Sequence, residues 1–192
     1  SSAASDVYKR QKFNRMTKYL TNLGWEVHRL SLNPNNGNGH LEQLAQQVDN
    51  YVNNNFFPKQ PIDLVGFSMG GLVTRYYLQR LGGIKKVQRY INISAPNNGT
   101  MTAYVLPNPG IKQMRPNSQF LQDLNKDIET TLNQIDVTVI WTPFDLMIFP
   151  PSSSKMGIGE EIKLPVLIHE QMVRHHQLLK TVSDSLSKPV KI

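Results

Sequence analysis

A serine between two glycines forms a pattern that proteins use for nucleophilic chemistry. Residues 66–70 read Gly-Phe-Ser-Met-Gly, which matches the G-x-S-x-G motif with Ser68 at its centre. The apolar run at 62–65 is typical of a buried strand, and a helical pattern opens at Leu72. This context predicts a nucleophile elbow at 66–70, where the glycines leave room between strand and helix. The alternative is a tight strand-to-helix turn that merely contains a serine.

A serine hydroxyl is a weak nucleophile, so Ser68 requires a histidine base and an acid that orients this base. In chains with this motif the order is serine, acid, histidine. Residues 136–141 read as a strand, and Asp145 follows its C-terminal end, where open parallel sheets place their sites. We therefore predict Asp145 as the acid, although an aspartate there also suits a plain turn. Asp136 and Asp63 lie at the opposite ends of their strands and are not expected to reach the serine.

Two histidines compete for the role of base. Residues 162–168 read as the last strand, and His169 follows this strand directly, at the sheet edge where a base must meet the serine. His175 is the alternative, because a longer loop would carry it to the same edge. The pair His175 and His176 also reads as the solvated start of a closing helix. We predict His169 as the base.

The elements around these residues alternate along the chain. Apolar periodicity predicts helices near residues 13–23, 41–52, 72–81 and 173–186, and strands at 25–32, 62–65, 87–94, 136–141 and 162–168. Such alternation implies an α/β fold, with a mostly parallel sheet that is covered by helices on both faces. Residues 97–133, rich in Pro and Asn, contain no clear strand and are predicted to cross the top of the sheet as a lid or cap.

Composition and charge narrow the expected partners. The 192 residues are 39% hydrophobic, carry a net charge of +7 and include no cysteine. The tight basic cluster of Lys85, Lys86 and Arg89 lacks interleaved aromatic residues, so we expect no nucleic-acid partner and treat a transient lipid interface as the alternative. No apolar run is long enough to span a bilayer, and no metal-ligand spacing is present. We therefore expect no transmembrane segment, no metal and no cofactor.

Four segments of the chain share motifs with one family of enzymes. They are residues 13–32, the elbow and its helix at 66–83, the stretch Ile-Ser-Ala-Pro-Asn-Asn-Gly-Thr at 93–100, and residues 114–121. These segments resemble the small bacterial triacylglycerol lipases and esterases of the α/β-hydrolase fold. The resemblance implies Ser68 as nucleophile, Asp145 as acid, His169 as base and the Met69 amide as one donor of the oxyanion hole. Asn97 stands where the family usually has a histidine, outside the triad.

The first residues resemble something else. Residues 1–11, SSAASDVYKRQ, resemble the translation of a sequencing-library adaptor, whereas the alternative is a natural Ser- and Ala-rich leader. We predict a non-native leader at 1–11 and a single α/β-hydrolase domain at 12–192. The resemblance implies that this domain lacks its N-terminal strand and the loop that supplies the second oxyanion donor.

Motif and resemblance together predict a serine hydrolase that cleaves carboxylic esters, with acylglycerols as the expected substrates. His169 would accept the proton of Ser68 during attack on the ester carbonyl, and water would then hydrolyse the acyl-enzyme. A thioesterase or an acyltransferase would use the same triad. A catalytically silent binding module with this fold is the alternative outside enzymes, and the intact triad argues against it.

Overall fold

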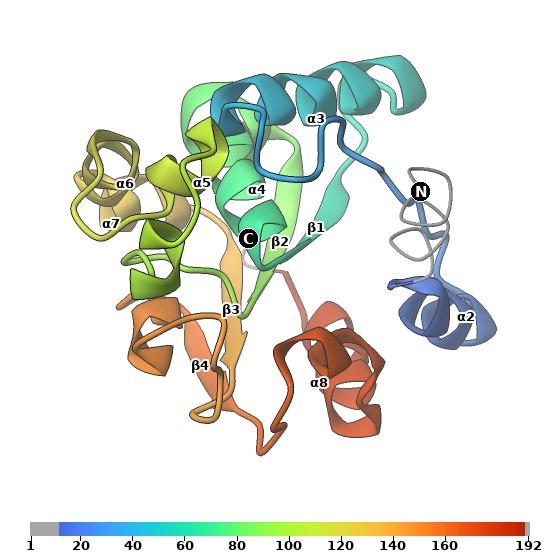
Figure 1. Ribbon diagram of the computed structural model, residues 1–192. Coiled ribbons are helices and arrows are strands. Elements are labelled where there is room, and N and C mark those ends of the chain that lie inside the picture. The colour runs from blue at the N-terminus through green and yellow to red at the C-terminus, as the bar shows by residue number, and fades with distance from the viewer. Residues whose placement is uncertain (1–11, 191–192) are drawn as a thin grey trace.

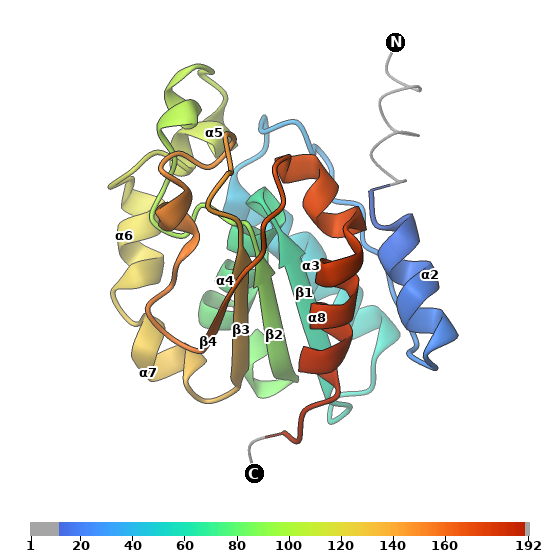
Figure 2. The ribbon, with the colours of Figure 1, turned by 90° about the horizontal axis from the view of Figure 1, so that it is seen from below.

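A parallel sheet organises the molecule. In residues 12–190, which the computed structural model describes, it consists of β1 (Ile62–Phe67), β2 (Val87–Ile93), β3 (Asp136–Trp141) and β4 (Glu160–Lys163). The strands lie in sequence order and each neighbouring pair is parallel. Their carboxyl ends therefore meet at one edge of the sheet (Figure 2). Residues 1–11, and with them the predicted leader, lie outside the described residues.

The helices cover both faces of this sheet (Figures 1 and 2). They are α2 (Asn14–Asn22), α3 (Leu41–Asn55), α4 (Met69–Arg80), α5 (Pro109–Gln113), α6 (Gln119–Asn125), α7 (Ile128–Leu132) and α8 (His176–Leu186). Short 3₁₀ turns are η1 (Gly83–Lys85), η2 (Met101–Tyr104), η3 (Pro151–Ser154) and η4 (His169–Arg174). The α-helices bury their apolar faces against the sheet, and this burial is the main source of stability for such amphipathic helices.

Alternation along the strands divides the core into two layers. Tyr90 of β2 and Val139 of β3 face the cluster formed by α3, α4, α6 and α7. Ile91 of β2 and Ile140 of β3 face the cluster formed by α2, η4 and α8. Neighbouring residues of a strand point to opposite faces, so a strand covered on both sides is apolar at consecutive positions. The predicted α/β-hydrolase fold class, with a parallel sheet and helices on both faces, is confirmed.

The predicted strand at 25–32 is wrong, because this segment connects α2 to α3 without entering the sheet. A strand exists only through backbone hydrogen bonds to a neighbour, and β1 pairs in the described residues with β2 alone. The apolar residues of the segment are still partly buried. Trp25 and Val27 pack on the core cluster that α2, η4 and α8 form, and Leu32 packs on the other core cluster.

The last predicted strand also differs. β4 ends at Lys163, the Leu164 amide still donates to the Trp141 carbonyl at 2.9 Å, and residues 165–168 then leave the ladder before η4 begins at His169. Pro165 has no N–H to donate to a ladder. The Val166 carbonyl instead accepts the hydroxyl of Thr142 at 2.6 Å. His169 therefore lies one short connection beyond the strand rather than at its exit.

The segment at 97–133 contains no strand, as predicted, but only part of it lies above the sheet. In Figure 2, α5 lies beyond the carboxyl ends of the strands, whereas α6 and α7 descend beside α4. Apolar side chains of α6 and α7 explain this course, because Phe120, Leu124 and Leu132 are buried in the cluster around α4. Only part of the segment therefore caps the sheet, and the rest packs along its side next to α4.

Candidate active site

Ser68 occupies the sharp turn between β1 and α4. Its backbone has φ +56° and ψ −130°, a region that costs a non-glycine residue about 1–3 kcal/mol. The Ser68 amide donates to the Ile93 carbonyl at 2.9 Å, and the Ser68 carbonyl accepts the Gly71 amide at 2.9 Å. The turn is therefore held at both sides in a strained conformation, which is the expected geometry of a nucleophile elbow.

Crowding at the elbow falls on Gly66 and Gly71. A Cβ added at Gly66 would lie 2.3 Å from Thr74 Oγ1 and 2.8 Å from the backbone of Gly71. A Cβ at Gly71 would lie 2.5 Å from the Cβ of Ala95. A Cβ at Gly70 would meet nothing within 4 Å. The expectation that both motif glycines must lack bulk is thus wrong for Gly70, since the first turn of α4 points that position away from strand and neighbours.

The structure brings Ser68, His169 and Asp145 into one chain of hydrogen bonds. His169 Nε2 lies 2.9 Å from Ser68 Oγ, although 101 positions separate the two residues. His169 Nδ1 lies 2.7 Å from Asp145 Oδ2. With the Nδ1 proton donated to the carboxylate, Nε2 is free to accept the serine proton. His169 and Asp145 are buried, while Ser68 is partly exposed.

A tight turn after β3 fixes the carboxylate. Asp145 Oδ1 accepts hydrogen bonds from the amides of Met147 and Ile148, each at 2.9 Å. The other carboxylate oxygen, Oδ2, therefore faces His169. The side chain is 1% exposed. The turn is tied to the segment after β2, because Phe149 N–H donates to Thr100 Oγ1 at 2.8 Å. Long-range contacts, rather than the turn alone, therefore set the position of the acid.

His175 and Met69 take different places. His175 is the N-cap residue of α8, and in the described residues its buried Nδ1 has no hydrogen-bond partner. His175 does not form a hydrogen bond with Ser68 like the one that His169 forms. Met69 is the first residue of α4, so its amide is among the N–H groups that have no acceptor within the helix. Such an amide is available to an oxyanion.

Asn97, which departs from the lipase pattern, belongs to a buried network behind the elbow. Its Oδ1 accepts from an Arg75 guanidinium nitrogen at 3.2 Å, and its Nδ2 donates to Asn92 Oδ1 at 2.9 Å and to the Ser154 carbonyl at 2.7 Å. Burial lowers the pKa of Arg75 to about 10. The network joins α4, β2 and η3, and none of these hydrogen bonds involves Ser68, Asp145 or His169.

Exposed apolar side chains gather around the site, a feature that the motifs did not signal. Ten of the thirteen large apolar side chains that are exposed in the described residues belong to three segments next to the triad. We call them the apolar collar: Met101, Tyr104, Val105, Leu106, Phe144, Leu146, Met147, Phe149, Leu167 and Ile168. Two of these segments are hydrogen-bonded to each other, since the Met101 amide donates to the Phe149 carbonyl at 2.8 Å. Apolar surface concentrated in this way marks an interaction site.

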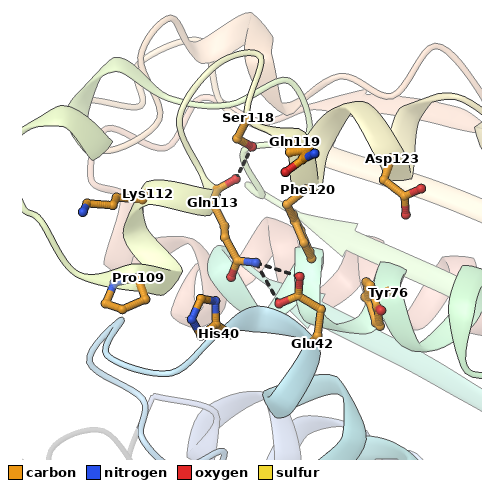
Figure 3. Close-up of a pocket in the computed structure, with 10 residues that line it drawn as sticks. All are labelled: His40, Glu42, Tyr76, Pro109, Lys112, Gln113, Ser118, Gln119, Phe120 and Asp123. Atoms are coloured by element: carbon orange, nitrogen blue, oxygen red, sulfur yellow. Dashed lines mark hydrogen bonds between the residues drawn. The ribbon is translucent and has the colours of Figure 1, made fainter.

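Another hollow lies away from the triad. It measures about 760 Å³, opens between α3, α4, α5 and α6, and is lined by no residue of the triad (Figure 3). Figure 3 shows Glu42 across from Gln113, whose Nε2 donates to the carboxylate at 2.7 and 2.8 Å. Phe120 and Tyr76 stack at one end with ring centroids 5.7 Å apart. The polar groups of Glu42 and Gln113 are therefore already hydrogen-bonded to each other.

The chain also resembles known proteins in sequence. The model of the palmitoyl protein thioesterase family matches residues 3–112, which include Ser68 but end before Asp145 and His169. The match begins inside the predicted leader, whose origin stays a prediction. No curated protein sequence matches the chain significantly.

Solved structures share its fold at low sequence identity. Lipase B from Aspergillus fumigatus superposes with a TM-score of 0.75 at 17% identity, over 93% of this chain and 50% of that one. An extracellular α/β-hydrolase from a Paenibacillus species gives 0.61 at 16%, over 94% of each chain. Lipase BlEst2 from Bacillus licheniformis gives 0.64 at 13%, over 90% of this chain and 83% of that one. The chain thus spans half the length of lipase B.

Proposed function

The chain belongs to the palmitoyl protein thioesterase family, and on this premise we propose that it is a serine hydrolase that cleaves carboxylic esters of long-chain acids. The observation that carries the proposal is the hydrogen-bond chain from Ser68 Oγ through His169 to Asp145. This arrangement supports the proposal because it offers a nucleophile, a base and an acid that holds the base.

The proposed mechanism follows from the distances. His169 Nε2 accepts the hydroxyl proton as Ser68 Oγ attacks the carbonyl carbon, and Asp145 stabilises the imidazolium that forms. The Met69 amide donates to the developing oxyanion. The leaving group takes the proton from His169, and a water molecule, activated by the same imidazole, then releases the acid and restores Ser68.

Two substrate classes compete. The apolar collar favours acylglycerols or other long-chain esters, because a bound acyl chain needs apolar surface close to Ser68. The description of the family model favours a thioester of a long-chain acid instead. Both classes pass through the same acyl-enzyme, so they differ only in the leaving group.

A fluorophosphonate probe tests the proposal. Ser68 Oγ attacks phosphorus, fluoride leaves and the proton passes to His169, so we expect a covalent adduct on Ser68 that peptide mass spectrometry locates. Turnover of p-nitrophenyl butyrate, triolein and an S-palmitoyl peptide in parallel then ranks the substrate classes. A protein that is folded but neither labelled nor active on any of the three would be a binding module, and the proposal would be wrong.

The collar suggests how a lipid substrate reaches the site. We infer that the apolar collar contacts the surface of a lipid aggregate while the triad acts on a lipid molecule in that surface. Arg115, which lies 4.8 Å over the ring of Tyr104, adds a positive charge beside the collar. Apolar area and a nearby cation are what interfacial binding requires.

Two collar residues and a distant residue give a matched test. Val105, Leu146 and Phe57 are each 79% exposed, and Phe57 lies between α3 and β1, at the opposite end of the sheet from the triad. We expect Val105→Ser combined with Leu146→Ser to lower hydrolysis of emulsified triolein about tenfold, because the lost apolar area weakens surface binding. Phe57→Ser should leave this activity unchanged. A soluble ester should be cleaved normally by all variants; an equal loss on both substrates would contradict the role of the collar.

A further inference from the structure

The ring of Phe67 lies against the imidazole of His169. The ring centroids are 4.9 Å apart and the planes are tilted by 30°, so the two rings lie in contact at a shallow angle. Phe67 is the last residue of β1 and directly precedes Ser68. The end of one strand therefore carries both the nucleophile and the surface on which the base rests.

A second ring holds the first in place. Phe13, just before α2, meets Phe67 edge-on, with centroids 6.2 Å apart and planes at 82°. Phe67 is buried and belongs to the core cluster between the sheet and α8. Edge-to-face pairs of this kind favour one orientation of the ring. Phe67 thus has little freedom to turn away from His169.

We propose that Phe67 is a positioning residue that orients His169 and favours its protonated form during acyl transfer, an inference that rests on the proposed function of the triad. An aromatic face carries partial negative charge and attracts a cation placed over it. His169 becomes such a cation when it accepts the proton of Ser68. The ring also keeps water from one side of the imidazole, which strengthens the attraction.

A test of Phe67 must leave the other charged groups near His169 unchanged. Asp145 Oδ2 lies 2.7 Å from Nδ1. Glu170 and Arg174 lie on η4 with His169, and Lys12, before α2, has its Nζ 3.7 Å from Glu170 Oε1. A substitution of Phe67 leaves all of these groups in the chain. A changed pH profile in such a variant therefore reports the loss of the ring.

Phe67→Leu removes the aromatic face and keeps an apolar side chain. We expect kcat on a soluble ester to fall about threefold to thirtyfold with KM unchanged, because only the transition state contains the imidazolium. The acidic midpoint of kcat/KM should move to lower pH than that of the wild type, because loss of the ring makes the imidazolium less favourable. Both quantities come from one series of pH-dependent initial rates.

Phe67→Tyr and Phe13→Leu are the matched controls. Phe67→Tyr keeps the ring and should retain the wild-type midpoint. Phe13→Leu removes a ring that touches Phe67 but has no ring contact with His169, so it should lower thermal stability without moving the midpoint. If Phe67→Leu does not fold, Phe67→Met supplies another apolar side chain without a ring. The pH dependence of fluorophosphonate labelling gives a second readout that needs no turnover.

The outcomes separate this inference from the proposed function. An active wild type whose Phe67→Leu variant keeps the wild-type midpoint and kcat would overturn the role of the ring and leave the triad standing. An equal shift in Phe13→Leu would also overturn it, because general loosening of the core would then explain the effect. A folded wild type that is neither active nor labelled would overturn the function together with the role of Phe67.

Discussion

Ser68→Ala should lower kcat for a soluble ester by about 10⁴-fold or more, because the acyl-enzyme can no longer form. The side chain contributes little to folding. It is partly exposed, and its hydroxyl is hydrogen-bonded to His169. The thermal unfolding midpoint should therefore stay close to that of the wild type. Activity that survives this substitution would remove Ser68 from the mechanism.

Ser68→Gly sharpens the same test. The backbone at position 68 has φ +56°, which glycine adopts without strain and alanine does not. We expect the glycine variant to be as inactive as the alanine variant. In urea unfolding it should be more stable than the alanine variant by about 1 kcal/mol, because the relief of backbone strain exceeds the cost of the greater entropy of unfolded glycine. This pair would show that the strain at the elbow serves to present the hydroxyl. A glycine variant that is less stable than the alanine variant would contradict the strain.

His169→Gln should lower kcat by about 10⁴-fold or more, a loss comparable to that of Ser68→Ala, because residues that act as one unit fail together. Glutamine fills a similar volume and still hydrogen-bonds, but it cannot accept and return the serine proton at neutral pH. Single-turnover kinetics with p-nitrophenyl butyrate would show whether acylation itself is lost. The same protein should no longer react with a fluorophosphonate at a measurable rate.

His175→Gln is the matched control. His175 lies six positions later and is the alternative base, but it is the N-cap residue of α8 and its buried Nδ1 has no hydrogen-bond partner in the described residues. We expect its kcat to remain within about twofold of the wild type. A large loss in His175→Gln with normal activity in His169→Gln would reverse the assignment of the base.

Local patterns in the sequence predict much of the architecture. The alternation of strands and helices was sufficient for the α/β-hydrolase class, and the bounds predicted for β3 match those of the structure. Helices α3 and α4 were also expected near their actual positions. These elements depend on periodic burial along the chain, which is written in neighbouring residues.

Predictions failed where an element depends on a distant partner. Residues 25–32 have the composition of a strand, but no described neighbour pairs with them. Residues 165–168 leave the ladder because Pro165 cannot donate and the Thr142 hydroxyl donates to the Val166 carbonyl. Part of the predicted lid at 97–133 packs beside α4 instead, because the apolar face of α6 is buried there. Local propensity is overridden in each case by tertiary contacts.

The sequence by itself predicted the elbow, because strand, turn and helix are consecutive there, and it limited the candidate bases to the histidines after Asp145. Only the tertiary structure decided between His169 and His175 for a place beside Ser68, since the two hydrogen-bonding residues are 101 positions apart. It also placed Phe67 against the imidazole and gathered the apolar collar around the site. Side-chain chemistry is encoded locally, but distances between side chains arise only when the strands align their carboxyl ends at one edge of the sheet.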